Sequence, residues 1–303
     1  MTRIALEFVP PDTAHGKERA IEDANKVRDL SHEHGIGDRI DTLMIPGMIA
    51  EDDDRPVAMR PKMDPLDVWT AAAPELPGIR GLCTQVTAFL DAPALSQRFG
   101  DLLGAGIEGI IFVGVPRTMA DGEGDGVAPT DALAQFQQQV PQRGVILIPT
   151  RDAEDGRFNF KCEQGANFAL TQLLYSDYIV RFLRDFAEKH PHRPEVLLSF
   201  GFVPKMERRL NLIQWLIQDH GNPLVDEERA FVARLGETKL KEKKRLLLDL
   251  YKRVVDGVQD LGFPISLHLE APYGFTRPAF ETFAEMLDYW APENPQGRKA
   301  VEG

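Results

Sequence analysis

The sequence has few cysteines, no excess of basic residues and no long apolar run. Its only cysteines, Cys83 and Cys162, have neither the number nor the spacing of a metal site or a disulfide framework, which favours a reducing, cytoplasmic setting. A net charge of −12 disfavours a nucleic-acid-binding surface, because such surfaces need clustered Lys and Arg. The sequence shows no run of 18 apolar residues and no basic segment followed by an apolar one at its start. We therefore expect neither a membrane span nor a secretion signal.

What the chain does contain is a repeated alternation of strand and helix patterns. Its 303 residues suit either two domains or one α/β barrel. Compact apolar segments predict strands over 3–9, 41–48, 79–86, 109–114, 145–149, 167–172, 195–201 and 262–270. Between them, helices are predicted over 21–30, 64–73, 92–103, 130–139, 158–164, 178–189, 204–218, 225–262 and 278–289.

Eight such alternations predict a parallel sheet that closes into a single (β/α)8 TIM barrel over residues 1–291. An open doubly wound sheet is the alternative, but no G-x-G-x-x-G follows an early strand. The nearest segment, 122–126, is acidic and would repel a pyrophosphate, so it is interpreted as a flexible loop. Residues 292–303 are polar and are predicted to be a disordered tail.

The tract 225–262 is predicted to be an extra helical insertion before the eighth strand, interrupted at Gly236. It carries a run of basic residues, namely Lys239, Lys241, Lys243, Lys244 and Arg245. We interpret this run as a solvated helix face, with binding to a partner as the less favoured alternative.

Polar residues at the C-terminal ends of barrel strands are the candidate site residues. Glu7 lies between Leu6 and Phe8, just before two prolines. Loss of water there would raise the pKa of its carboxyl group, which suits a general acid; the alternative is an ordinary strand-end glutamate paired with a surface arginine. Thr84 and Gln85 close another apolar strand and are expected to face the same pocket.

Two motifs in this chain resemble the 5,10-methylenetetrahydrofolate reductase family. Leu6-Glu7-Phe8-Val9-Pro10-Pro11 is similar to that family's E-F-x-P-P strand end. The family's pattern K-x-x-x-G-A-x-x-x-L-T-Q is carried by Lys161, Gly165, Ala166, Thr171 and Gln172. The resemblance implies that Glu7 protonates N10 of methylenetetrahydrofolate, which opens the five-membered ring to an iminium at N5. That iminium then accepts a hydride and becomes the methyl group.

The resemblance implies further roles. Gln172, whose amide both donates and accepts, would hold the pterin ring; the alternative is a capped strand end. Lys161 would bind a phosphate or carboxylate of the cofactor, unless it is a helix-surface lysine. Arg277, after the last strand, would hold the glutamate tail of folate by a bidentate contact. Glu270, at the end of that strand, is a candidate for the pterin's amino-pyrimidine edge, the alternative being a helix-capping or surface glutamate. No metal site is predicted.

Three departures from the family pattern concern the flavin. Val113-Gly114-Val115 stands where the family has R-G-D, the tyrosine-rich segment after strand five is replaced by 148–152, and the strand-two end at 44–47 lacks the usual polar residues. The chain therefore resembles a divergent branch that passes hydride directly from NADH to the folate. We predict NADH-dependent reduction without flavin. The alternatives are the same reaction with bound FAD or a deazaflavin (F420), and a non-catalytic folate- or partner-binding barrel.

Overall fold

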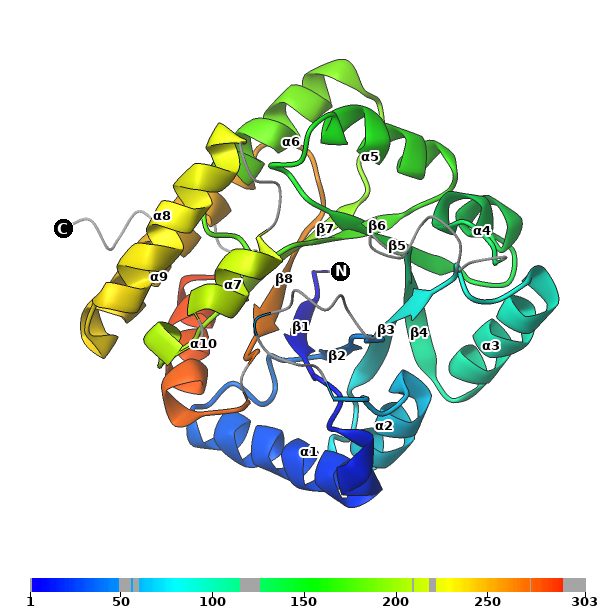
Figure 1. Ribbon diagram of the computed structural model, residues 1–303, viewed down its shortest axis with the longest axis horizontal. Helices are drawn as coiled ribbons and strands as arrows, with labels where there is room; N and C mark the ends of the chain where they lie inside the picture. Colours follow the sequence, from blue (N-terminus) through cyan, green and yellow to red (C-terminus); the bar gives the residue numbers. More distant parts are fainter. Residues whose placement is uncertain are drawn as a thin grey trace.

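The computed structural model describes residues 2–48, 56, 60–114, 126–208, 210–217, 222–272 and 274–290. Eight parallel strands pair in sequence order and close on themselves. They are β1 (Ile4–Glu7), β2 (Thr42–Ile45), β3 (Arg80–Val86), β4 (Ile107–Val113), β5 (Gln142–Leu147), β6 (Phe168–Thr171), β7 (Glu195–Gly201) and β8 (Ile265–Glu270). Figure 1 shows the helices as a ring around these strands. The predicted (β/α)8 barrel is confirmed.

Several of the helices that follow the strands begin at strong start signals. The helices are α1 (Gly16–Glu33), α2 (Pro65–Ala72), α3 (Ala92–Gly104), α4 (Pro129–Gln135), α5 (Glu154–Glu163), α6 (Tyr178–Lys189), α7 (Leu210–Leu216), α8 (Pro223–Glu237), α9 (Leu240–Val258) and α10 (Arg277–Tyr289). Short 3-10 turns are η1 (Thr13–His15), η2 (Ala73–Glu75) and η4 (Met206–Arg208). Asp64, Asp91, Asn222 and Thr276 each cap a helix by accepting a backbone N–H, with a proline in the first turn. Such caps satisfy backbone donors that have no partner inside the helix.

Alternate residues of each strand point into the barrel, as the pleat of a strand requires. The interior is filled by a compact apolar cluster, made of Ala5, Met44, Leu82, Ile111, Phe168, Leu170 and Leu197. The intervening residues point outward and pack against the helices in the larger core cluster. A polar residue at the end of a strand can have the same parity as these inward-facing residues. Its side chain must then point into the open end of the barrel.

Helices α7, α8 and α9 form the insertion between β7 and β8. Together with η4 they share a separate apolar cluster that includes Met206, Ile213, Val232 and Leu246. In Figure 1, α7 lies between the barrel strands and the two longer helices α8 and α9. The insertion therefore brings α7 next to the barrel.

The boundaries of this insertion differ from the predicted ones. The interruption falls at Thr238 and Lys239, which have extended backbones, whereas Gly236 is inside α8 because one glycine costs a helix only about 1 kcal/mol. The helix predicted over 204–218 is a turn, η4 and the shorter α7. The predicted tail at 292–303 and most of the predicted loop at 122–126 lie outside the described residues.

The basic run on α9 is largely ion-paired. Lys243 is buried rather than solvated, and its Nζ donates to the Pro204 carbonyl and to Glu207. Lys244 pairs with two glutamates of α10, and Arg245 with acids on its own helix. Apart from the exposed Lys239 and Lys241, the run is engaged within the protein. None of the helices in the described ranges is long and apolar enough to cross a membrane.

Candidate functional site

A cavity of about 270 Å³ opens at the C-terminal ends of the strands, where TIM barrels carry their active sites. It is lined by Glu7, Met44, Pro46, Thr84, Ile146, Leu170, Thr171, Gln172, Leu173, Tyr175, Ile213, Ile217, His268 and Glu270. Glu7, Thr84, Gln172 and Glu270, four of the predicted site residues, thus meet in one space. Ile213 and Ile217 of the α7 segment form an apolar wall, so the insertion contributes to the cavity.

Glu7 is the last residue of β1, and it is partly buried in the wall of the cavity. Burial and, to a lesser extent, the nearby Glu270 together raise the pKa of Glu7 to about 8, against an opposing effect of His268. The direction of this pKa shift agrees with the one expected from the apolar neighbours in the sequence. At neutral pH the carboxyl group is therefore mostly protonated and can act as an acid.

His268 and Glu270 lie on β8 and point into the barrel two residues apart. The His268 Nδ1 atom is 2.9 Å from Ser199 Oγ and 3.2 Å from Glu270 Oε1. Burial raises the pKa of Glu270 to about 8 and lowers the pKa of His268 to about 4. His268 is not among the site residues expected from the sequence, although it lies two residues before Glu270 and therefore faces the same side of β8.

Thr84 and Gln85 point in opposite directions, as neighbouring residues of a strand must. Thr84 lines the cavity, and its hydroxyl accepts the Gly47 N–H at 2.6 Å. The Gln85 amide instead donates to the Val86 carbonyl at 2.8 Å and accepts from Arg98 of α3 at 2.9 Å. The expectation that Gln85 faces the pocket is therefore wrong.

Gln172 follows directly after β6 and is held in place through its backbone. Its N–H donates to the Leu147 carbonyl at 3.0 Å, at the end of β5. Upstream, Gly165 ends the turn after α5 with φ +104°, the left-handed conformation expected for a glycine at a helix C-terminus. This turn and the β5 contact fix the strand that brings Gln172 to the cavity wall.

Lys161 does not line the Glu7 cavity but the neighbouring one. This second cavity, of about 660 Å³, shares Pro46 and Ile146 with the first and includes Arg151 and Lys161 in its wall. The Lys161 ammonium donates to the Ile146 carbonyl at 2.9 Å and to Glu154 Oε1 at 3.0 Å. With a side chain only 20% exposed, it is not an ordinary helix-surface lysine.

Arg277 lies away from both cavities. Its side chain is 75% exposed and pairs with Glu33 of α1 at 3.3 Å. The structure therefore does not place Arg277 where it could hold the tail of a folate in the Glu7 cavity. Within the described residues, no three His, Cys, Asp or Glu side chains are arranged to hold a metal ion.

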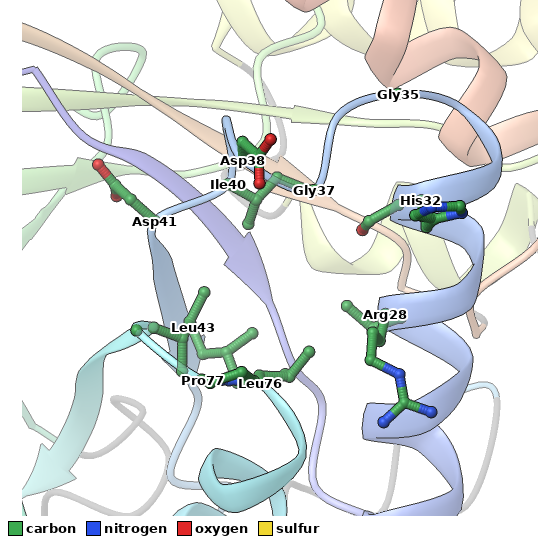
Figure 2. A pocket seen from close by; sticks show the side chains of 14 residues that line it. Arg28, His32, Gly35, Gly37, Asp38, Ile40, Asp41, Leu43, Leu76 and Pro77 are labelled. Carbon is green, nitrogen blue, oxygen red and sulfur yellow. The ribbon is translucent and has the colours of Figure 1, made fainter.

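A third cavity, of about 580 Å³, lies before β2 and β3, at the opposite end of the barrel. Figure 2 shows Arg28 and His32 of α1 on one side of it and Asp38, Ile40 and Leu43 on the other. Arg28 pairs with Asp29 and Glu75, and Asp41 pairs with Arg80 at 2.6 Å. None of the predicted site residues lines it, so we place the candidate site at the C-terminal end.

Comparisons with known proteins agree with the barrel fold described above. No curated protein matches the sequence. An uncharacterized protein from Clostridium thermocellum, which binds two copies of 5-methyl-5,6,7,8-tetrahydrofolic acid, superposes with a TM-score of 0.66 at 16% identity, over 95% of each chain. At this low sequence identity, the similarity shows only that the two proteins share a fold. An aldolase designated QR15 has a TM-score of 0.42 at 13% identity, over 70% of this chain and 85% of its own, which is too low to support an argument.

The family comparison covers nearly the whole chain. A family model described as mycobacterial methylenetetrahydrofolate reductase matches residues 1–294, which include all eight strands and every cavity residue named above. The protein therefore belongs to the mycobacterial methylenetetrahydrofolate reductase family.

Proposed function

We propose that the protein reduces 5,10-methylenetetrahydrofolate to 5-methyltetrahydrofolate with hydride from NADH, without a bound flavin. The observation that carries this proposal is the position of Glu7, a carboxyl group with a pKa of about 8 in a cavity shared with Gln172. Family membership supports the reaction class. The folate bound by the structural neighbour, 5-methyltetrahydrofolate, is the product of the proposed reaction.

Glu7 would supply the proton that starts the reaction. The Glu7 proton moves to N10 of the folate. The bond between N10 and the bridging carbon breaks, and the electron pair of that bond stays on N10. The carbon is left as an iminium at N5, which takes up a hydride and becomes the methyl group. A pKa near the working pH is what an efficient general acid needs, and such an acid contributes roughly 10²- to 10⁴-fold to the rate.

The two adjoining cavities would hold the two reactants. Pro46 and Ile146 line both cavities, so the two spaces adjoin, and the nicotinamide ring of a dinucleotide held in the second space would reach past these residues to contact the folate ring beside Glu7. Arg151 and Lys161 give the second cavity two cationic side chains, which suit the phosphates of NADH. The protein would mainly have to orient the two rings, since the iminium is a strong electrophile.

Gln172 and Glu270 would recognise the pterin. The Gln172 amide can donate to a ring carbonyl and accept from a ring N–H. The Glu270 carboxyl group, when ionised, accepts the N–H donors of an amino-pyrimidine edge. Both residues line the same cavity as Glu7, so the groups that would hold the ring and the acid that would protonate it face one space.

The test is anaerobic stopped-flow absorbance of the purified protein, with NADH and methylenetetrahydrofolate added separately and then together. We expect oxidation of NADH only when both are present, in a protein without a flavin spectrum. A yellow protein whose flavin is reduced by NADH alone would favour the flavin-dependent alternative. Absence of NADH oxidation under all conditions, including added FAD or F420, would leave a folate-binding barrel without reductase activity.

A further inference from the structure

Glu7 and Glu270 share one cavity but have different hydrogen-bond surroundings. The Glu270 carboxyl group is hydrogen-bonded to the Ser199 hydroxyl, and Glu270 Oε1 lies 3.2 Å from His268 Nδ1. In the parts of the chain that the structure describes, no group donates a hydrogen bond to the Glu7 carboxyl group. The two carboxyl groups are therefore not equivalent.

Ser199 is held in a position that maintains its contact with Glu270. The Ser199 N–H donates to Thr171 Oγ1 at 2.9 Å, and Ser199 Oγ lies 2.7 Å from the Thr171 carbonyl oxygen and 2.9 Å from His268 Nδ1. Ser199 is fully buried, so these contacts are shielded from solvent. A hydrogen bond donated to a carboxylate stabilises its ionised form, and the bond from Ser199 acts on the pKa of Glu270 in this direction.

The cavity provides no positive charge that could neutralise both carboxyl groups. Among the described residues that line it, the titratable side chains besides Glu7 and Glu270 are His268 and Tyr175, and there is no Lys or Arg. Burial lowers the pKa of His268 to about 4, so its ring is neutral at physiological pH. Glu7 and Glu270 lie at the ends of adjacent, paired strands. Two neighbouring carboxyl groups in such a place hold one proton between them at neutral pH.

We propose that Glu270 is a positioning residue: it is the ionised member of the pair, held by Ser199 and His268, and its charge keeps the reacting proton on Glu7. The proposal deepens the function proposed above and rests on it, because that function gives Glu7 the role of acid. When the Glu7 proton moves to N10 and the bond from N10 to the bridging carbon breaks, two carboxylates share the cavity with the positively charged iminium. The charge that retains the proton in the free protein then stabilises the cation that forms.

The direct test is a pH titration of the ligand-free protein, labelled with ¹³C at the glutamate carboxyl carbons, with Glu7→Gln and Glu270→Gln to assign the two signals. We expect Glu270 to ionise first and Glu7 to retain the last proton of the pair up to about pH 8. In Glu270→Gln, Glu7 should titrate about one pH unit lower or more, because the neighbouring charge is absent. An unchanged Glu7 titration in that variant, or ionisation of Glu7 before Glu270 in the wild type, would overturn the proposal.

Ser199→Ala tests the difference between the two carboxyl groups without removing either of them. This variant loses the hydrogen bond to Glu270, so part of the last proton should move to Glu270, and Glu7 should begin to ionise at a lower pH. Ser266→Ala is the matched control, because Ser266 is an equally buried serine that bonds to Glu195 instead, and it should leave both titrations unchanged. Identical titrations in the two serine variants would contradict the role of Ser199.

The pH dependence of turnover separates this role from simple binding of the pterin. Because a general acid must be protonated, kcat should fall as Glu7 ionises, and in Glu270→Gln this fall should begin about one pH unit lower than in the wild type. A change in KM with an unshifted alkaline limb of kcat would limit Glu270 to binding and contradict the proposal. If the wild-type protein has no reductase activity, the proposed function fails, and the titration of the ligand-free protein still decides which carboxyl group holds the proton.

Discussion

Glu7 and Glu270 stand next to each other at the ends of adjacent strands, one residue beyond the paired Leu6 and Leu269. The pKa of each is raised to about 8, mainly by burial, and the charge of Glu270 contributes to the increase at Glu7. Two carboxyl groups in one cavity resist being ionised together. The cavity therefore retains a proton at neutral pH, in the position where the proposed reaction uses one.

The raised pKa of Glu7 has a consequence for stability. Between pH 4.5 and about 8 the folded protein keeps the Glu7 proton while the unfolded chain releases it, so stability falls as pH rises through this window. Glu7→Gln cannot ionise and should be more stable than wild type at pH 7.5, on the order of 1 to 3 kcal/mol, but not at pH 4.5. Urea unfolding at both pH values measures this, and Glu108→Gln, at an exposed position, is the control. If Glu7→Gln changed the free energy of unfolding equally at both pH values, the result would contradict the raised pKa of Glu7.

Gln172 and Gln85 provide a matched pair, because both lie near the C-terminal end of a strand but point to different sides of the barrel wall. Gln172→Ala should weaken folate binding about tenfold, the typical effect of one or two lost hydrogen bonds in a buried site, with kcat changed little. Gln85→Ala should leave folate binding unchanged and cost only its hydrogen bonds with the Val86 carbonyl and Arg98. Isothermal titration with folate and steady-state kinetics distinguish the two. Unchanged binding in Gln172→Ala would remove Gln172 from the pterin site.

Arg277 is a test of the revised site. Since its exposed side chain pairs with Glu33, Arg277→Ala should remove a surface ion pair worth about 0 to 1 kcal/mol of stability and leave folate affinity within about twofold. Titration calorimetry with methyltetrahydrofolate measures this affinity. A loss of tenfold or more would show that the arginine reaches the ligand after binding, as we expected from the sequence.

The apolar wall from α7 should contribute to affinity. Ile213 is buried in the insertion and lines the cavity, so Ile213→Ala should raise the folate Kd roughly 5- to 30-fold, equivalent to about 1 to 2 kcal/mol of lost apolar contact. Leu240→Ala, at a position 47% exposed, is the control and should bind normally. Equal affinities for both variants would show that α7 does not contact the ligand.

Most of the fold could be predicted from local patterns, because each strand is a compact apolar run and eight such runs suffice to close a barrel. Glu7 was also recognisable, since its apolar neighbours and the two prolines are adjacent in sequence. Gln85 was misplaced because the pattern does not say which of two neighbouring polar residues points inward. Arg277 was misplaced because its partner Glu33 is distant in sequence. His268 was missed because its contact with Ser199 joins two strands that are distant in sequence.

The most direct test of the central claim, that Glu7 protonates a folate reduced by NADH itself, is a single-turnover reaction with NADH deuterated at the transferred position. Wild type and Glu7→Gln are mixed anaerobically with methylenetetrahydrofolate, and the product is analysed by mass spectrometry. The account predicts one deuterium in the methyl group with wild type, and a rate at least about 10²-fold lower with Glu7→Gln despite retained folate binding. Loss of the label to solvent, or a near-normal rate in Glu7→Gln, would contradict it.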